Sequence, residues 1–289
     1  MKLVLLAAFL WSLNGLLIRQ IHDAGTWAVL FWRSAGMIPV LLVVIARRSG
    51  GALVAPLRTV GWAGTLGGAG LVLAFGGAIF AFQATTVANA VFLFSASPFL
   101  AALLGWIVLR ETVRPATWVA IALAASGIFF MVREGLVAGA MAGNIAALLS
   151  ALGFASFTIA LRWGRLADML PAVVLGGVFS MLAAFFAATV QGETLLVSVR
   201  DTSIALAMGA GILATGMALY TAGSRVIPAA DLTLFSMVEV LLAPIWVFVM
   251  IGETASPGTF VGGAVLMAAV AFNALSGAVR RRVVTTPAP

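Results

Sequence analysis

Long apolar runs dominate the chain and alternate with short segments that carry charge, Gly or Pro. A helix that crosses the hydrocarbon core of a bilayer needs about 20 apolar residues. Strands of a membrane barrel are disfavoured, because each would be about ten residues long with polar residues at alternate positions. The pattern therefore predicts an all-α integral membrane protein with ten transmembrane helices. Their predicted ranges are 3–21, 26–46, 60–83, 86–109, 114–133, 142–162, 170–190, 202–223, 229–251 and 256–279.

Composition agrees with a protein embedded in the membrane along its whole length. Of the 289 residues, 63% are hydrophobic and 9% are charged, whereas soluble domains are about 25% charged. The mean hydropathy is +1.17, and no polar block between the runs is long enough to fold by itself. These features exclude a soluble enzyme and a soluble domain on a single anchor. The start of the chain also fits a signal peptide, but we predict a retained first helix because its apolar run continues to Ile18.

The basic residues predict the orientation of the helices. The net charge of +7 would suggest nucleic acid in a soluble chain, but here Lys and Arg lie near helix ends and no nucleic-acid partner is expected. Cytoplasmic ends retain Lys and Arg, which predicts that both termini lie in the cytoplasm. The residues assigned to the inner side are Lys2, Arg47, Arg48, Arg58, Arg110, Arg114, Arg162, Arg165, Arg225, Arg280, Arg281 and Arg282, against Arg19, Arg133 and Arg200 outside.

The residue inventory argues against several kinds of chemistry. The chain has no Cys and a single His, His22, so disulfides, thiolate metal sites and thiol catalysis are excluded and no metal site or cofactor is expected. No Gly-Lys-Ser or Gly-Lys-Thr phosphate loop occurs, which excludes transport driven by ATP on this chain. We therefore expect neither a catalytic site nor an enzyme.

The sequence contains an internal repeat. At an offset of 143, Trp11 and Arg19 align with Phe154 and Arg162. A repeat of five helices has an odd number of membrane crossings, so the second copy must be inverted, as in many secondary transporters. The predicted units are 1–134, 135–282 and a tail, 283–289. At an offset of 142, the residues Glu111, Thr112, Pro115 and Thr117 recur as Glu253, Thr254, Pro257 and Thr259.

Several local motifs fit a known family. They are Leu-Trp-Ser-Leu-Asn-Gly at 10–15, Phe-Trp-Arg at 31–33, Ser97-Pro98, and the helices that end in Glu111 and Glu253. With the repeat, the chain resembles the EamA family of the drug/metabolite transporter superfamily, and within it the exporters of aromatic and other amino acids. The resemblance implies a basket of ten helices in two inverted five-helix repeats. It also implies a central cavity lined by helices 1 to 4 and 6 to 9, with helices 5 and 10 peripheral.

Two charged residues lie deep in predicted helices. At 1.5 Å per residue, Glu239 lies roughly 15 Å into the ninth helix, and Arg33 lies inside the second. Intramembrane charges are costly unless they are paired or face water, so they mark candidate sites. One reading is that they bind the ammonium and carboxylate of a substrate. The other is a structural ion pair between Arg33 and Glu239.

Polar residues and Pro interrupt two other predicted helices. Pro98 lies mid-helix after Ser95 and Ser97 and frees the carbonyl of Phe94, which needs a cavity or a side chain to satisfy it. Asn14 lies in the middle of the first helix. The alternatives are an ordinary kink at Pro98 and interhelical hydrogen bonding by Asn14.

Aromatic residues complete the candidate site. Their rings suit an aromatic amino acid or a flat organic cation, whereas contact with lipid is the alternative for each Phe. The predicted substrate-binding residues are Trp11, Asn14, Arg33, Phe80, Phe92, Ser95, Ser97, Pro98, Phe157, Tyr220, Ser236 and Glu239.

The sequence predicts a secondary transporter that works by alternating access. The resemblance implies that it exports amino acids, aromatic ones included, across the bacterial inner membrane, as a monomer or, alternatively, a dimer. The alternative substrates are flat cationic drugs such as viologens or another small metabolite. An intramembrane enzyme is disfavoured because no matched pair of acidic residues occurs at depth. A channel is disfavoured because the polar residues are isolated and form no continuous stripe.

Overall fold

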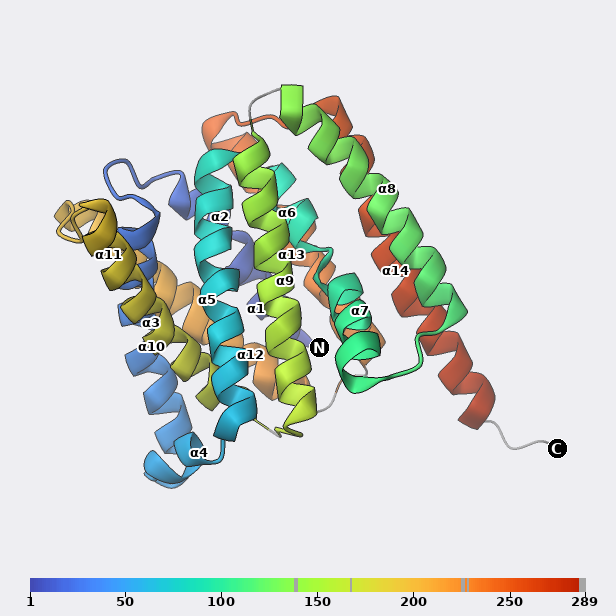
Figure 1. Cartoon of the computed structure of the whole chain (residues 1–289), viewed down its shortest axis with the longest axis horizontal. Helices are drawn as coiled ribbons and strands as arrows, with labels where there is room; N and C mark the ends of the chain where they lie inside the picture. Colours follow the sequence, from blue (N-terminus) through green and yellow to red (C-terminus); the bar gives the residue numbers. More distant parts are fainter. Residues whose placement is uncertain (138–139, 167, 225–226, 228, 286–289) are drawn as a thin grey trace.

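The computed structural model describes residues 1–137, 140–166, 168–224, 227 and 229–285, without the side chains of 134–137, 224, 229–233 and 278–285. All regular elements in these residues are helices (Figure 1). In chain order they are α1 (Lys2–Ser12), α2 (Asn14–Ile18), α3 (Thr26–Arg48), α4 (Val54–Arg58), α5 (Gly61–Ala84), α6 (Val87–Phe94), α7 (Ser97–Leu109), α8 (Pro115–Val137), α9 (Met141–Trp163), α10 (Leu170–Gln191), α11 (Val199–Ala207), the π-helix η1 (Met208–Ala214), α12 (Thr215–Ser224), α13 (Ala229–Ile251) and α14 (Pro257–Thr285).

Nine of the helical segments within the described residues are long and apolar enough to cross a membrane. A tenth, Lys2–Ile18, is apolar but shorter. The chain is thus an all-helical, multi-pass membrane protein, as the hydropathy pattern predicts. Most predicted boundaries agree closely: the second helix was expected at 26–46 and is Thr26–Arg48, and the seventh was expected at 170–190 and is Leu170–Gln191.

Glycine allows close packing between α5 and α9. A Cβ on Gly70 would lie 2.9 Å from the carbonyl oxygen of Gly153, and one on Gly153 would lie 2.5 Å from the backbone nitrogen of Ala74. Such short distances show that the two backbones touch. In a bilayer this dispersion contact, rather than escape from water, stabilises the association of helices.

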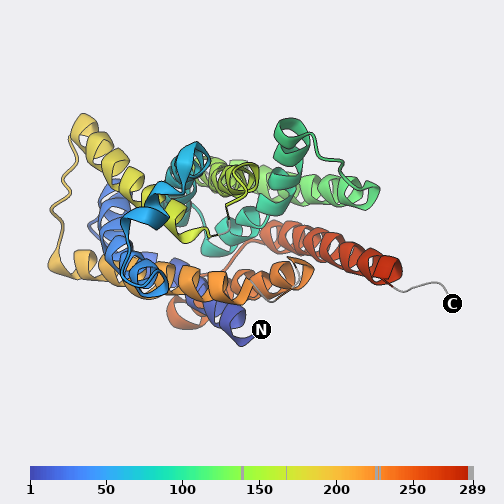
Figure 2. The same ribbon diagram turned by 90° about the horizontal axis from the view of Figure 1, so that it is seen from below.

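Helices α8 and α14 lie side by side at one edge of the molecule, away from α3 and α10 (Figures 1 and 2). Gly127 and Gly262 bring them together, because a Cβ on either would lie within 2.6 Å of the other residue's carbonyl oxygen. The fifth and tenth predicted helices are therefore at the periphery. On the other side of the bundle, α3 packs against α10 and η1, and α1 packs against α12 and α13.

Three of the crossings are not continuous α-helices. The first is interrupted at Leu13, whose N–H reaches back only three residues to the carbonyl of Leu10. The fourth is interrupted at Ser95 and Ala96, immediately before Pro98. The eighth contains the π-helix η1. Interruptions of this kind leave backbone groups without helical partners, and membrane proteins tolerate them where protein or a cavity satisfies those groups.

Candidate functional site

An aromatic–amide cluster, Trp11, Asn14 and Tyr220, lies beside the interruption of the first helix. The ring centroids of Trp11 and Tyr220 are 5.5 Å apart, and the ring planes are tilted by 40°. Asn14 is three residues after Trp11, so both side chains lie on one face of the helix. The Nδ2 of Asn14 donates to the carbonyl oxygen of Trp11 at 2.9 Å. The sequence-predicted residues of this cluster are therefore neighbours in space.

Two polar atoms of the cluster are buried without a partner. They are Nε1 of Trp11, a donor, and Oδ1 of Asn14, an acceptor, and neither makes a hydrogen bond within the described residues. Leaving a buried polar group unpaired costs about 1–3 kcal/mol. Native proteins leave few groups in this state, and functional sites are among the places where they do. The pair therefore has unused capacity to bind one acceptor and one donor of a ligand.

Gly216 on α12 fixes the position of the indole. A Cβ at this residue would lie 2.2 Å from Nε1 of Trp11, so only glycine leaves room for the ring. Tyr220 is four residues further along the same helix and lies on the same face. One turn of α12 thus supplies both the space for Trp11 and the ring that packs against it.

Arg33 is buried, with 4% of its surface exposed. Its Nη2 donates to the carbonyl oxygen of Phe75 at 3.3 Å, and its guanidinium carbon lies 5.1 Å from the centroid of the Phe75 ring. Its Nε has no hydrogen-bond partner in the described residues. The hypothesis of an Arg33–Glu239 ion pair does not hold, because the two ion pairs among the described residues involve other groups. Cation–π and backbone contacts hold the arginine instead.

Glu239 and Ser236 are three residues apart on α13, and both are partly buried. Ser97 and Pro98 form the first turn of α7 and are also partly buried. Pro98 lies where its missing N–H breaks the fourth helix, so the predicted distortion at this proline occurs. Whether these four residues contact a substrate remains a prediction.

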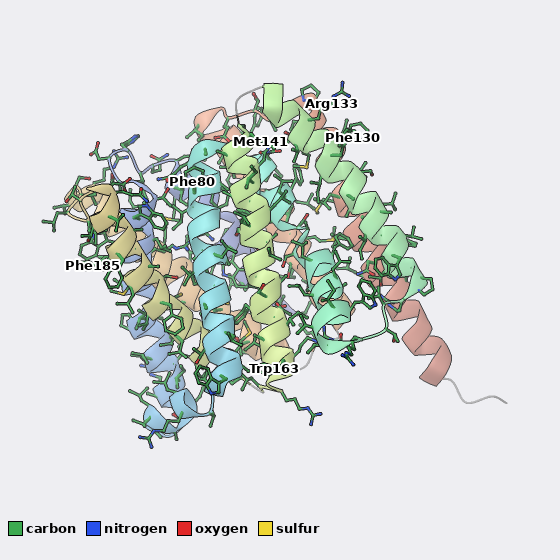
Figure 3. All side chains as sticks on the ribbon, in the orientation of Figure 1. Phe80, Phe130, Arg133, Met141, Trp163 and Phe185 are labelled. Atoms are coloured by element: carbon green, nitrogen blue, oxygen red, sulfur yellow. The ribbon has the colours of Figure 1, made fainter. Side chains whose placement is uncertain are left out.

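Other predicted residues take part in packing. The Oγ of Ser95 donates to the carbonyl oxygen of Phe92 at 2.6 Å and so caps the end of α6. The ring of Phe92 lies against Gly263 of α14, and the buried ring of Phe157 lies against Gly67 of α5. Phe80 is 40% exposed near one end of α5 (Figure 3). None of these phenylalanines joins the aromatic–amide cluster by a ring contact in the described residues.

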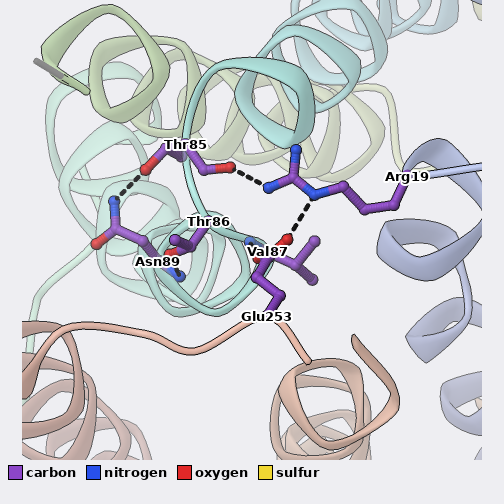
Figure 4. A network of polar contacts seen from close by, with 6 residues as sticks. All are labelled: Arg19, Thr85, Thr86, Val87, Asn89 and Glu253. Atoms are coloured by element: carbon purple, nitrogen blue, oxygen red, sulfur yellow. Dashed lines mark hydrogen bonds and ion pairs between the residues drawn. The ribbon is translucent and has the colours of Figure 1, made fainter. Parts of the chain in front are cut away.

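A polar pocket of about 440 Å³ opens at one end of the bundle. Arg19 lines it: Nε contacts Oε2 of Glu253 at 2.6 Å, and Nη2 donates to the carbonyl oxygen of Thr85 at 2.7 Å (Figure 4). The backbone N–H of Val87 donates to Oε1 of Glu253 at 2.6 Å. The lining residues are Arg19, Gln83, Ala84, Thr85, Thr86, Asn89, Met131, Ala140, Glu253, Ser256 and Thr259.

A buried amide network extends from this pocket into the bundle. Asn89 donates to Oγ1 of Thr85 at 3.1 Å and to Oδ1 of Asn144, and it accepts from Thr259 at 3.3 Å. Asn144 is buried on α9, so the network links α6, α9 and α14. Sequence reasoning did not select Asn89 or Asn144 for the site, and it interpreted Arg19 as a topology signal. The signal available was the repeat, in which Arg19 aligns with Arg162 and Glu253 aligns with Glu111.

The comparisons with known proteins agree with this architecture. Residues 1–133 match the EamA-like transporter family, and this match supports assignment of the chain to the EamA family of the drug/metabolite transporter superfamily. A crystal structure of a protein that is 18% identical matches with a TM-score of 0.65 and covers 95% of this chain and 96% of its own. At that identity the match shows a shared fold over nearly the whole chain. The comparison with curated proteins gives no match.

The family match suggests the general activity. EamA proteins are membrane transporters of small substrates rather than enzymes in general. A multi-pass bundle with nine long apolar helices and a shorter one suits that role, because it can enclose a polar path within lipid.

Proposed function

We propose that the protein is a secondary transporter that exports amino acids, aromatic ones included, by alternating access. The observation that carries this proposal is the unpaired donor and acceptor of the aromatic–amide cluster. An amino acid has a carboxylate that accepts hydrogen bonds and an ammonium that donates them. Nε1 of Trp11 suits the carboxylate and Oδ1 of Asn14 suits the ammonium.

The neighbouring rings add a reason to favour amphipathic amino acids. Trp11 and Tyr220 present two aromatic surfaces beside the polar atoms. Aromatic pairs gain about 0.5–1.5 kcal/mol beyond the burial of their area. A phenylalanine side chain would therefore find ring contacts within reach of the groups that bind its charged end. Smaller amino acids would keep the polar contacts and lose the ring contact.

Matched helix ends support two inverted repeats over 1–134 and 135–282. Arg110 and Gly252, 142 residues apart, both adopt the left-handed conformation, with φ of 54° and 71°. The N–H of the following Glu111 and Glu253 then bonds to the carbonyl six residues back, at 3.2 Å in each case. Gly is the usual residue at such a position. Because Arg110 adopts the same conformation in the first copy, the two copies share the geometry of this turn although the residue differs.

The orientation follows from the arginines. The proposal places the protein in a bacterial inner membrane with both termini in the cytoplasm, since basic residues gather at the ends assigned to that side. It places the pocket around Arg19 on the outer side. We propose a monomer as the working unit, because the cluster is formed by α1, α2 and α12 of one chain.

Flat cationic drugs are the second candidate, favoured by the ring pair alone. A cation over Trp11 or Tyr220 would gain about 0.5–2 kcal/mol. A viologen, however, has no carboxylate for Nε1 of Trp11 and no ammonium hydrogen for Oδ1 of Asn14. The cluster therefore favours the amino acid.

Flux measurements with the purified protein in liposomes test the proposal. Labelled phenylalanine, threonine and a viologen dye are followed separately, with and without a proton gradient. We expect flux of phenylalanine and, more slowly, of threonine. Flux that responds to the gradient indicates proton antiport, and flux that does not indicates uniport. Viologen flux without amino-acid flux would replace the first candidate with the second, and no flux of either amino acid would reject the first.

A further inference from the structure

Two ion pairs connect the proposed halves of the chain, and the repeat relates one to the other. Nε of Arg19 lies 2.6 Å from Oε2 of Glu253. Nη2 of Arg162 lies 2.5 Å from Oε1 and 2.6 Å from Oε2 of Glu111. Arg19 aligns with Arg162, and Glu111 aligns with Glu253. In each pair the arginine of one half therefore meets the glutamate of the other.

The two pairs lie at opposite ends of the bundle. Arg162 is next to Trp163 at the lower end of α9, whereas Met141 marks its upper end (Figure 3). The connection from α13 to α14, which carries Glu253, is at the upper end, together with the end of α2 (Figure 1). A passage between the halves would thus have one pair at each mouth.

Both glutamates leave their helices in the same way. Each follows a left-handed residue that ends the preceding helix, Arg110 or Gly252. The matched backbone hydrogen bonds aim each side chain across the gap toward the other half. A shared terminal turn of this kind fixes direction by backbone geometry, so neither contact depends on a flexible loop.

The surroundings of the two pairs differ. The side chains of Arg19 and Glu253 are 23% and 17% exposed, and they bond to the backbone of Thr85 and Val87 at the start of α6. The side chains of Arg162 and Glu111 are 49% and 40% exposed and make no further hydrogen bond within the described residues. The Arg19–Glu253 pair is thus supported by bonds to the backbone, whereas the side chains of the Arg162–Glu111 pair bond only to each other within the described residues.

We propose that these four residues are alternating gates: the Arg19–Glu253 pair closes one mouth of the transport path and the Arg162–Glu111 pair closes the other. The inference rests on the alternating access proposed above and adds the residues that perform it. Both pairs are formed in the structure, so opening either mouth breaks one Arg–Glu pair while the other stays formed. A small bias from substrate then suffices to shift the population.

Sided labelling tests this proposal without measuring transport. The chain has no cysteine, so Asn14→Cys, and in a second series Ser97→Cys, introduces a single thiol. A membrane-impermeant maleimide is applied to right-side-out and to inside-out vesicles. Opening a mouth should raise the labelling rate from that side only. We expect Arg19→Ala to raise the labelling rate about fivefold when the maleimide is applied from the Arg19 side, and to lower the rate when it is applied from the Arg162 side.

Arg162→Ala should give the opposite pattern. The charge exchange Arg19→Glu with Glu253→Arg should return both rates to within about twofold of the parent, because it restores the attraction. Matched controls are Arg133→Ala at the upper end (Figure 3) and Arg58→Ala on α4 at the lower end (Figure 1). Both arginines are exposed and have no ion-pair partner among the described residues.

Rates that change equally from both sides, or no more than in the control variants, would overturn the proposal and leave the pairs as static links. Failure of the exchange variant to restore the parent pattern in both thiol series would also overturn it. The readout does not involve an amino acid. The gates can therefore hold while the substrate assignment fails, and amino-acid flux can persist while the gates fail.

Discussion

The indole of Trp11 lies against the phenol ring of Tyr220, with centroids 5.5 Å apart, and its Nε1 has no hydrogen-bond partner in the described residues. An indole N–H that is buried normally finds an acceptor. Here the helix interruption at Leu13 brings the unpaired Oδ1 of Asn14 onto the same face. The first helix thus supplies an unpaired donor, an unpaired acceptor and one ring, and α12 supplies the second ring.

Replacing Gly216 tests whether transport depends on the position of the Trp11 indole. We expect Gly216→Ala to displace the indole, because the new Cβ would lie 2.2 Å from Nε1 of Trp11. Inserting a methyl into a packed site costs about 1–3 kcal/mol, so phenylalanine flux should fall by roughly tenfold. Gly211→Ala is the matched control, since nothing lies within 4 Å of its Cβ. Equal flux in the two variants would contradict the role given to Trp11.

Substitutions of two tryptophans, Trp11 and Trp246, distinguish an effect on substrate binding from an effect on protein stability. Trp11→Phe removes an unpaired donor, so the melting temperature should stay unchanged while flux falls. A hydrogen bond to a charged group contributes about 1.5–3 kcal/mol, which predicts a loss of roughly 10- to 100-fold. Trp246→Phe removes a donor that bonds to Oγ of Ser12 at 2.9 Å. That variant should lose about 0.6 kcal/mol of stability and keep its flux. Wild-type flux in Trp11→Phe together with reduced flux in Trp246→Phe would exclude the aromatic–amide cluster as the binding site.

Gly209 tests the contact between α3 and η1. A Cβ at this residue would lie 1.9 Å from the carbonyl oxygen of Arg33, and a backbone atom cannot move aside without shifting the helix. Gly209→Ala should therefore lower the melting temperature by about 5 °C. Gly211→Ala again serves as the control and should have the same melting temperature as the wild type. A wild-type melting temperature for Gly209→Ala would mean that α3 and η1 do not touch.

Glu239 tests the link between charge and transport. Glu239→Gln keeps the shape of the side chain and removes its ionisation. If the carboxylate carries a proton or holds the substrate ammonium, flux should fall by about tenfold or more, and any response to a proton gradient should disappear. Glu239→Asp, which keeps the ionisable carboxyl group, is the matched control and should keep the response to the gradient. Wild-type flux and wild-type gradient response in Glu239→Gln would exclude both roles.

Hydropathy predicted most of the fold because a bilayer imposes a length on every apolar run. It did not predict the interruption at Leu13, since the apolar run continues to Ile18 across Ser12 and Asn14 and only backbone hydrogen bonding marks the break. The eighth helix was expected at 202–223 and begins earlier, at Val199, because Ser198 caps it by accepting from the N–H of Asp201. Caps and π-helices depend on contacts that a hydropathy window does not register.

The candidate site was predictable in part. Depth and polarity selected Trp11, Asn14 and Tyr220, which the fold brings together, but equal depth also selected Phe157, which packs between α5 and α9. Depth does not determine which face of a helix a residue occupies. The Arg19–Glu253 pair was missed because helix ends 234 residues apart are joined only by the tertiary fold.

Counterflow of phenylalanine tests the central claim most directly. Liposomes that contain the protein are loaded with unlabelled phenylalanine and diluted into a trace of labelled phenylalanine. A transporter that binds the amino acid at Trp11 and Asn14 should accumulate label transiently, and Asn14→Leu, with no polar atom at that place, should not. Absence of counterflow in the wild type, or equal counterflow in Asn14→Leu, would contradict the account.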